Sequence, residues 1–382
     1  MCGICGILST QFIDIPVNVL HEKFFTIKYR GPEKSICIND DNYALTFHRL
    51  AINDKSTLGD QPFNFSYKYI QKDDEGKETI FRRTIYIMCN GEIYNSKELM
   101  EQEDVQEMIE RLNFNYKSRS DCEVLMPLFL SVIQEDYYQE RFKQQEEGTY
   151  EKEQDKGIFG MLLRINGEFA FSIYDIFTNV ETDEMTYNLW LGRDRFGIRP
   201  LFYSMIDDKT VAFGSELKSI NFGDNKDIPE NYKNNKVIPV DPRTWYLFSQ
   251  DKEKKLDQMS NLYYGAGMYK IVKNPDMSDV RRMIKEKLIE SVRKRLHCDR
   301  EIGCLLSGGF DSSLIAGIAA RELLHEGKKL ITFSIGMKDS PDIKYAQIVA
   351  DHINSDHTTI EIPEEEWFKA VDYVIHITET FD

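Results

Sequence analysis

The sequence predicts an α+β domain followed by an α/β domain. In the first 220 residues, short segments rich in β-branched and aromatic residues are separated by turns, and several alternate apolar and polar positions. From about residue 278 onward, strand-like and helix-like segments alternate, which is the spacing of a parallel sheet with crossover helices. The boundary between the two patterns is therefore expected within 250–278.

Six segments of the first domain are predicted to be strands, and they indicate antiparallel sheets stacked between helices. They span 42–52, 84–95, 168–175, 187–194, 201–206 and 210–215. A helical pattern occupies 121–134. Three polar stretches are expected to be surface excursions without a functional role: 71–78, 134–157 and 221–236.

The second domain opens with a predicted helix over 278–298, for which Ser278 is the expected N-cap. Apolar residues recur every four positions on one face of this helix: Val280, Ile284, Leu288, Val292 and Leu296. The segments that follow are a strand over 302–307, a helix over 312–327, a strand over 330–337, a helix over 340–354 and a strand over 357–363. This order predicts a parallel sheet.

The composition is that of an ordinary globular protein, and it disfavours several classes of function. Of the 382 residues, 41% are hydrophobic and 29% are charged, with a net charge of −16, which argues against nucleic-acid and anionic-membrane partners. No apolar run approaches the length of a membrane span, and the run at 3–9 is too short for a secretory signal. The seven cysteines follow no disulfide framework, so a reduced, cytoplasmic location is expected.

The turn "LLSGGFDSS" at 305–313 lies between a predicted strand and a predicted helix. Its two glycines let the backbone approach a ligand, and the helix adds its N-terminal dipole. Ser307, Ser312 and Ser313 offer hydroxyl donors, and Asp311 offers a carboxylate for Mg²⁺ beside a pyrophosphate. The string is neither a Walker A loop nor a G-x-G-x-x-G motif. The first three letters alone favour a plain glycine turn, whereas the full string in this context favours a phosphate site.

The chain opens with "MCGICGI", which places Cys2 and Cys5 in a C-x-x-C spacing. A redox pair would need a βαβ context, which the N-terminus lacks, and a zinc site would need a second ligand pair with metal spacing. Cys5 is expected to be a small core residue on the first strand. A third possibility is that Cys2 is a nucleophile at the end of the chain, and the rest of the sequence has to decide among the three.

Both halves of the chain resemble known families. The turn at 305–313 is similar to the pyrophosphate loop of the ATP-pyrophosphatase superfamily, whose fold is adenine nucleotide alpha hydrolase-like. The first half resembles the class II, N-terminal-nucleophile glutamine amidotransferase domain, through "MCGICGI" (1–7), "YRGPE" (29–33), "HRLAIND" (48–54), "QP" (61–62), "NGEIYN" (90–95), "SDCEVL" (120–125), "GEFAFSIYD" (167–175), "RDRFGIRPLFY" (193–203) and "GSELKS" (214–219). In this order the two modules resemble the glutamine-hydrolysing asparagine synthetases, as do "FSIGMKDSPDIKYAQIVADHI" (333–353) and "HITETFD" (376–382).

The resemblance implies a glutaminase domain over 2–215, a connecting segment over 216–255 and the N-terminal part of a synthetase domain over 256–382. Two departures stand out. Glu33 occupies a position where the family usually has Asp. Family members also continue well past the "TFD" equivalent, with a second glycine-rich nucleotide-contacting motif and further basic residues, so the synthetase domain is expected to be C-terminally incomplete.

For the glutaminase site, the resemblance implies that Met1 is removed and that Cys2 attacks glutamine. An α-amine titrates near pH 8, so the Cys2 amine can accept the thiol proton at neutral pH. Asn90 and Gly91 are the implied oxyanion donors, although on their own they would indicate a hairpin turn. Arg49 and Asp121 are implied to bind the glutamine head, although each alone would indicate a surface ion pair. The other implied pocket residues are Leu50, Ala51, Ile52, Asn53 and Glu92.

For the ATP site, the resemblance implies that the glycine turn binds phosphates and that Asp311 holds Mg²⁺. The phosphate-binding residues would be Ser307, Gly308, Gly309, Asp311, Ser312 and Ser313. The backbone of Leu305 or Leu306 and that of Ile335 are expected to border the adenosine.

The implied reaction is glutamine-dependent asparagine synthesis. Ammonia from glutamine would pass through the interior and attack β-aspartyl-AMP, made from aspartate and ATP with release of pyrophosphate. The implied partners are therefore glutamine, aspartate and ATP, and a homodimer is among the implied assemblies. Three alternatives stay open: a chain that only hydrolyses glutamine, a nucleotide-binding regulatory module, and a related amide-forming synthetase, which a complete glutaminase site argues against.

Overall fold

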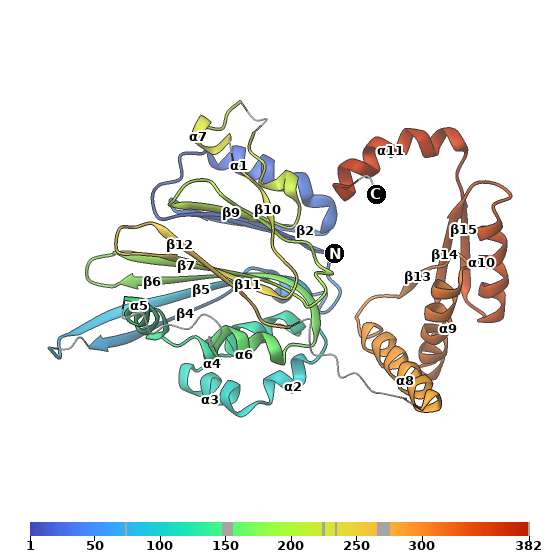
Figure 1. Cartoon of the computed structure of the whole chain (residues 1–382), viewed down its shortest axis with the longest axis horizontal. Helices are drawn as coiled ribbons and strands as arrows, with labels where there is room; N and C mark the ends of the chain where they lie inside the picture. Colours follow the sequence, from blue (N-terminus) through green and yellow to red (C-terminus); the bar gives the residue numbers. More distant parts are fainter. Residues whose placement is uncertain (73–74, 147–155, 224–225, 234, 266–275, 381–382) are drawn as a thin grey trace. The chain divides into compact units, whose positions relative to one another are not determined.

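A computed structural model describes residues 1–72, 75–146, 156–223, 226–233, 235–265 and 276–380 (Figure 1). The chain forms two compact units, Met1–Met268 and Tyr269–Asp382, and each is described by itself. The predicted fold class is confirmed, because the described strands pair antiparallel in the first unit and parallel in the second.

The first unit contains two six-stranded antiparallel sheets. The first sheet has the strand order β10-β8-β9-β1-β3-β2, and the second has the order β12-β11-β7-β6-β5-β4. The strands of the first sheet are β1 (Gly3–Ser9), β2 (Lys34–Asp40), β3 (Tyr43–Arg49), β8 (Phe202–Met205), β9 (Thr210–Gly214) and β10 (Ile238–Pro239). Those of the second are β4 (Phe63–Lys72), β5 (Glu78–Ile93), β6 (Gly167–Asn179), β7 (Met185–Arg193), β11 (Thr244–Gln250) and β12 (Leu256–Leu262).

Helices cover the outer faces of the two sheets, which gives the first unit four layers (Figure 1). The described helices and 3-10 turns are α1 (Val17–Phe24), η1 (Phe25–Arg30), η2 (Thr57–Gly59), α2 (Ser96–Met100), α3 (Glu103–Leu112), η3 (Asp121–Val124), α4 (Leu125–Val132), α5 (Tyr137–Glu146), α6 (Lys156–Arg164), η5 (Leu217–Ser219) and α7 (Glu230–Lys233). One apolar core lies between the two sheets. A second lies between the first sheet and its helices, and a third lies between the second sheet and its helices.

Strand β1 shows why the sequence folds in this way. Ile4 and Leu8 pack into the core between the sheets, whereas Cys5 and Ile7 pack into the core beneath α1. Because successive side chains of a strand point to opposite faces, a strand between two apolar layers must be apolar throughout. Every residue of β1 is buried accordingly, and Cys5 is a core residue as predicted.

A fully buried ion pair joins β5 to β6. Arg83 Nε and Nη2 donate to the two carboxylate oxygens of Asp175 at 2.9 and 2.8 Å. Tyr138 donates its hydroxyl to Asp175, and Trp190 donates its indole N–H to Tyr138. The carboxylate therefore has several partners, as a charge needs when it is removed from water.

The second unit has a three-stranded parallel sheet in the order β13-β14-β15. Its elements are α8 (Met277–Arg295), β13 (Gly303–Leu305), α9 (Phe310–His325), β14 (Ile331–Gly336), α10 (Pro341–His352), β15 (Asp356–Glu361) and α11 (Glu364–Thr378). Its core is made of buried residues of α8, α9 and α10 and the ends of the first two strands.

Two details of α8 differ from the prediction. Asp276 caps the helix, since its carboxylate accepts the Ser278 N–H at 2.8 Å, so Ser278 lies inside the first turn. Ile284 is 62% exposed, whereas Val292 is buried. A spacing of exactly four residues drifts around a helix of 3.6 residues per turn, so the five apolar positions do not all face one core.

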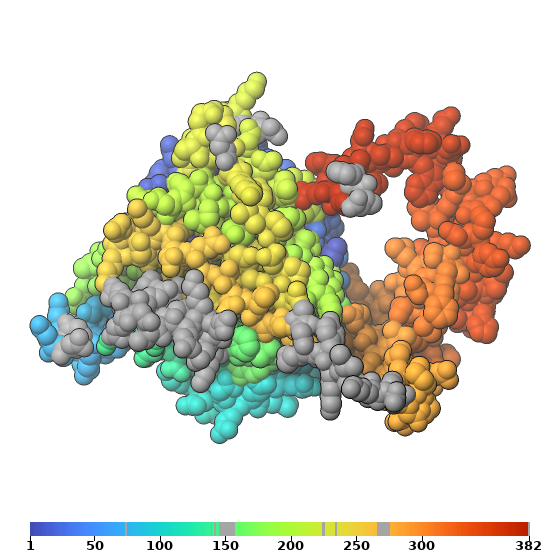
Figure 2. Space-filling model, viewed as in Figure 1, coloured from blue at the N-terminus to red at the C-terminus, as the bar shows by residue number. Residues whose placement is uncertain are grey.

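The compact units divide at 268/269, which lies within the predicted boundary range 250–278 and after the start at 256 that the resemblance implies for the second domain. Strands β10 and β11 lie within 216–255, and β12 begins at Leu256, yet all three belong to the sheets of the first unit. Residues of β11 and β12 form one continuous surface with the rest of that unit (gold in Figure 2). The pairing of β11 with β7 over Asn188–Gly192 and Trp245–Ser249 holds them there.

Candidate active site

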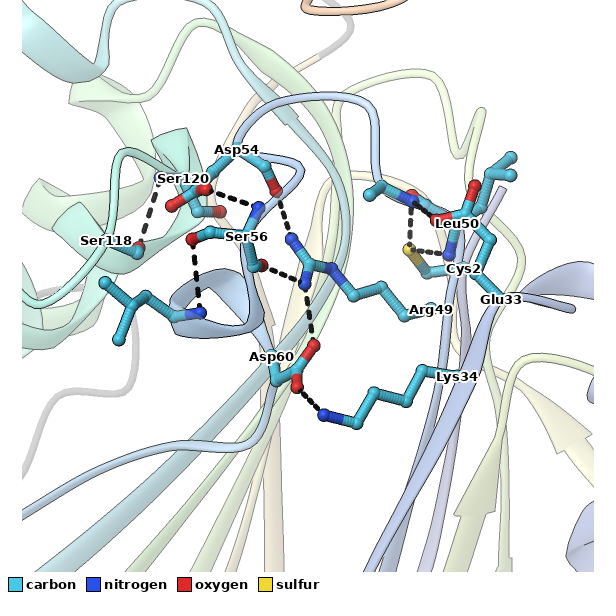
Figure 3. A network of polar contacts seen from close by, with 12 residues as sticks. Cys2, Glu33, Lys34, Arg49, Leu50, Asp54, Ser56, Asp60, Ser118 and Ser120 are labelled. Atoms are coloured by element: carbon cyan, nitrogen blue, oxygen red, sulfur yellow. Dashed lines mark hydrogen bonds and ion pairs between the residues drawn. The ribbon is translucent and has the colours of Figure 1, made fainter.

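Cys2 immediately precedes β1 at the N-terminal end of the first sheet. Its thiol lies against the backbone of Leu50, with Sγ 3.4 Å from both the Leu50 N and the Leu50 O (Figure 3). Burial raises the pKa of the Cys2 thiol, and the Leu50 N–H offsets part of that increase by stabilising the thiolate. Attack by this sulfur therefore needs a base close by.

Arg49 ends β3 and is held by the loop that follows it (Figure 3). Its Nη1 donates to the Ser56 carbonyl and to Asp60 Oδ1, both at 2.6 Å, and its Nη2 donates to the Asp54 carbonyl. These contacts use three of the five guanidinium N–H donors. Within the described residues, the other two remain available to a ligand carboxylate.

The loop after Arg49 is held by Glu33, the residue that stands where the family usually has Asp. Glu33 Oε2 accepts the Ala51 N–H at 3.2 Å (Figure 3). The longer side chain of Glu thus still reaches the backbone of the predicted glutamine-binding loop.

Asn90 and Gly91 lie inside β5 and do not form a hairpin turn. Asn90 is 1% exposed, and its Nδ2 has no acceptor among the described residues. A buried amide donor without a partner is costly, and such donors occur where a ligand supplies the acceptor. At Gly91, a Cβ atom would come within 2.1 Å of the Glu168 carbonyl oxygen, so only glycine allows β6 to approach this closely.

Two partly buried carboxylates meet at Asn53. Its Nδ2 donates to Glu92 Oε2 at 2.5 Å and to Asp121 Oδ1 at 3.2 Å, and the Ile93 N–H donates to Asp121 Oδ2 at 2.5 Å. Burial, followed by repulsion from Asp121, raises the pKa of Glu92 to about 8. Burial also raises the pKa of Asp121, against the effect of its hydrogen bonds. A ligand cation would relieve this repulsion.

A pocket of about 30 Å³ brings most of the predicted glutamine-site residues together. Asn90 is not one of the lining residues, but its sequence neighbours Cys89 and Gly91 are. The predicted residues that line it are Cys2, Arg49, Leu50, Ala51, Ile52, Asn53, Gly91, Glu92 and Asp121. Lining residues without a predicted role are Phe47, Gly59, Gln61, Cys89, Ser120 and Cys122.

Gln61 shows what sequence reasoning missed in this pocket. It belongs to the quoted "QP" motif, but no role followed from two letters. Gln61 Oε1 accepts the Cys89 N–H at 2.7 Å, which fixes β5 directly before Asn90.

In the second unit, the glycine turn joins β13 to the N-terminus of α9, as predicted. Ser307 and Ser312 lie 3.0 Å apart through their hydroxyls, and Ser313 donates to the Gly309 carbonyl at 2.6 Å. Gly308 has φ +78°, and a Cβ atom there would lie 2.5 Å from the Ala346 N. The turn therefore requires glycine at this position both for its backbone angle and for space.

The other predicted nucleotide-site residues lie around this turn. Asp311 is in the first turn of α9. Leu305 and Ile335 are exposed, whereas the Leu306 side chain is buried and its N–H donates to the Phe333 carbonyl at 2.7 Å. Among the residues that the structure describes, no group of three or more His, Cys, Asp or Glu could hold a metal ion.

The fold and the pocket fit one class of protein: a glutamine amidotransferase domain joined to an α/β unit with a glycine-rich turn. The family model for the glutamine amidotransferase domain matches residues 48–222, and that for asparagine synthase matches residues 283–382. The chain therefore carries a glutamine amidotransferase domain followed by a region that matches asparagine synthase, and it is similar to the glutamine-hydrolysing asparagine synthetases.

Relatives align along the whole chain. A protein described as a probable glutamine-hydrolysing asparagine synthetase of Acanthamoeba polyphaga mimivirus is 31% identical over 397 residues. The asparagine synthetases of Homo sapiens and Pongo abelii are each 29% identical over 400 residues. Each alignment covers 100% of this chain and 60% of the relative, so the chain spans about three-fifths of the length of these proteins. In the described part of the chain, no helix is long and apolar enough to span a membrane.

Proposed function

We propose that the chain acts in glutamine-dependent asparagine synthesis, with a glutaminase site at Cys2 and an ATP site at the glycine turn of the second unit. The observation that carries this proposal is the pocket of the first unit. It presents a nucleophile, an arginine and a pair of partly buried carboxylates to one small volume, and the unpaired amide donor of Asn90 lies in the sequence between two of its lining residues. Glutamine has a matching group for each of them.

The glutaminase reaction follows from this arrangement. Once Met1 is removed, the α-amine of Cys2 accepts the thiol proton, and the thiolate attacks the side-chain amide of glutamine. The tetrahedral intermediate collapses to a γ-glutamyl thioester as ammonia leaves with a proton from the amine. Water then hydrolyses the thioester to glutamate and regenerates the thiol.

Asn90 and Gly91 would stabilise the tetrahedral oxyanion. The Asn90 Nδ2 gains in the transition state the acceptor that it lacks among the described residues. A fixed donor of this kind lowers the activation barrier by about 3–4 kcal/mol. The Gly91 N–H is the proposed second donor.

The head of glutamine is proposed to bind at the opposite charges of the pocket. Arg49 would bind the α-carboxylate with its two available N–H donors. Glu92 and Asp121 would bind the α-ammonium, which replaces the mutual repulsion of the carboxylates by attraction. The backbone of residues 50–53 would complete the pocket.

In the second unit, the turn at 307–313 is proposed to bind the phosphates of ATP, with adenosine bordered by Leu305 or Leu306 and by Ile335. The exposed hydroxyls and the N-terminus of α9 suit an anion. Aspartate would attack the α-phosphorus and release pyrophosphate, and ammonia would displace AMP to give asparagine. Mg²⁺ neutralises phosphate charge when bound. Asp311 is the proposed protein ligand, which fits because Mg²⁺ is commonly held by one or two carboxylates plus substrate phosphates.

Two assays on the 382-residue chain test the proposal. The first measures glutamate release from glutamine, with Cys2→Ala as the control. The second measures pyrophosphate release from ATP–Mg²⁺ with aspartate and ammonium, with Asp311→Ala as the control. Both activities are expected, each lost in its own control.

The outcomes separate the alternatives. Glutamate release without aspartate-dependent pyrophosphate release would reduce the function of this chain to that of a glutaminase. Pyrophosphate release that depends on a carboxylate other than aspartate would identify a related amide-forming synthetase. Absence of both activities would overturn the proposal.

A further inference from the structure

A buried ion-pair network outside the glutamine pocket holds the backbone of Cys2. Arg30 Nε donates to the Cys2 carbonyl at 3.0 Å, and Arg30 Nη1 pairs with Glu216 Oε1 at 2.7 Å. The two side chains are only 7% and 6% exposed. Arg30 ends η1, and Glu216 precedes η5, so segments about 190 residues apart meet at the first residue of the chain's active site.

Cys2 needs such a hold because it lies beyond the end of the described ladders. The β1–β3 ladder ends at Gly3 opposite His48, and the β1–β9 ladder ends at Cys5 opposite Gly214. Beyond the second ladder, the Ser215 N–H donates to the Ile4 carbonyl at 2.8 Å, and the Ser215 hydroxyl accepts the Ile4 N–H at 3.0 Å. Glu216, the next residue, then reaches Cys2 through Arg30.

Glu216 is built to stay ionised. Burial alone would raise the pKa of its carboxyl, but hydrogen bonds from Lys218, Tyr29 and Arg30 hold that pKa below its usual value. Lys218 Nζ lies 2.6 Å from Glu216 Oε2, and Tyr29 donates its hydroxyl to the same oxygen. The carboxylate therefore compensates two cations beside the N-terminus.

We propose that Glu216 is a positioning residue for the nucleophile: through Arg30 it fixes the Cys2 backbone and balances positive charge near the terminal amine. The inference rests on the proposed glutaminase function and deepens it. Attack requires the sulfur and the amide carbon at about 3–3.5 Å, and a misplacement of about 1 Å can cost about 100-fold in rate. A residue that never touches glutamine can therefore set the rate.

The test compares Glu216→Gln with the matched control Lys218→Met. The Gln variant keeps the shape of the side chain and removes its charge, whereas the control removes a cation from the same carboxylate and leaves the Arg30 contact in place. For Glu216→Gln, we expect kcat for glutamate release to fall by about 10–100-fold, with KM for glutamine changed by less than about twofold. The control is expected to keep kcat within about twofold of the wild type.

The pH profile supplies a readout that a purely structural role would not move. Burial and, to a smaller extent, the charge of Arg30 lower the pKa of the Met1 amine. Without the Glu216 charge, Arg30 is uncompensated and should lower the pKa of the Cys2 amine, which is terminal once Met1 is removed. The acid limb of kcat/KM should therefore shift to lower pH in Glu216→Gln and return toward the wild-type position in Glu216→Asp. If Glu216→Gln fails to fold, Glu216→Asp tests the tether through kcat alone, because its shorter side chain keeps the charge but reaches less far toward Arg30.

Equal kcat losses in Glu216→Gln and Lys218→Met, or a Gln variant with wild-type kcat and pH profile, would overturn the inference. A wild-type chain that releases no glutamate would instead overturn the proposed function. In that case the rate at which iodoacetamide alkylates Cys2, followed by mass spectrometry, still tests the tether. An unchanged alkylation rate in Glu216→Gln would then refute it.

Discussion

Asn90 is a buried strand residue whose amide donor has no acceptor among the described residues, and the residues on either side of it line the glutamine pocket. Asparagine followed by glycine usually indicates a turn. Here the pair lies inside β5, close to its C-terminal end and next to Cys89, which is held by Gln61. The strand thus fixes the direction of the donor before any ligand arrives, which is the requirement for electrostatic preorganisation.

Asn90→Ala is therefore expected to lower kcat for glutamate release by about 100–1,000-fold while KM for glutamine changes little. Asn188→Ala is the matched control, because Asn188 is equally buried and its Nδ2 also lacks an acceptor in the described structure, but its sequence neighbours do not line the pocket, whereas both neighbours of Asn90 do. Steady-state kinetics of both variants decide the matter. Equal losses of kcat would assign Asn90 a structural role only.

Glu92 and Asp121 predict a pH dependence of glutamine binding. The pKa of Glu92 is raised to about 8 in the empty site, so its protonated, neutral form increases as the pH falls below 8. A neutral carboxyl does not balance the glutamine ammonium. The affinity for glutamine should therefore fall by up to about tenfold per pH unit between pH 8 and pH 6.

Isothermal titration calorimetry on the Cys2→Ala variant measures this dependence without turnover. Proton release on binding at pH 7 should appear as a dependence of the apparent enthalpy on the buffer. Glu92→Gln should flatten the profile. A dissociation constant that is the same at pH 6 and pH 8 would contradict the proposed ammonium subsite.

At the scale of elements, the turn between β13 and α9 depends on one glycine. Gly308 has a positive φ and lies close to the backbone nitrogen of Ala346 in α10. The neighbouring serines bond to the turn itself, so the loop is preformed. A preformed loop binds phosphate without the entropic cost of ordering it.

Gly308→Ala is expected to weaken ATP binding by about tenfold or more, since a strained residue of this kind costs about 1–3 kcal/mol and α10 would have to move. Gly317→Ala is the control, because Gly317 lies within α9 and a Cβ atom there would meet nothing within 4 Å. The ATP-dependent shift of the melting temperature distinguishes the two variants. An unchanged shift in Gly308→Ala would remove this turn from the nucleotide site.

At the scale of the whole molecule, the chain carries two compact units with separate cores and separate candidate sites. The glutamine pocket is lined only by residues of the first unit, and the glycine turn belongs to the second. No residue belongs to both sites. The two half-reactions should therefore be separable by mutation.

Asp311→Ala is expected to keep glutamate release within about twofold of the wild type, because sites without shared partners behave independently. Cys2→Ala is expected to keep ammonium-dependent pyrophosphate release to the same extent. The two assays, run on both variants, measure this directly. Loss of both activities in either variant would mean that the half-reactions are coupled.

The sequence by itself determined the kinds of elements and their order. Period-two segments predicted the antiparallel strands, and strand–helix alternation predicted the parallel sheet, because these patterns reflect which face of a local element is buried. The sequence also indicated the glycine turn. Through short motifs that resemble a known family, it implied which residues form the glutamine pocket. These signals span a few residues, so one sequence contains them.

Only the tertiary structure decided how distant residues combine. It brought Asp121 to Glu92 through Asn53, committed Arg49 to Asp60, and tied Glu216 to Cys2 through Arg30. It also assigned β11 and β12 to the first unit, which ends at Met268, within the range 250–278 expected from the sequence pattern. The physical reason is that strand pairing and burial join segments far apart in the chain, and no local pattern encodes which partner a strand or a charge will meet.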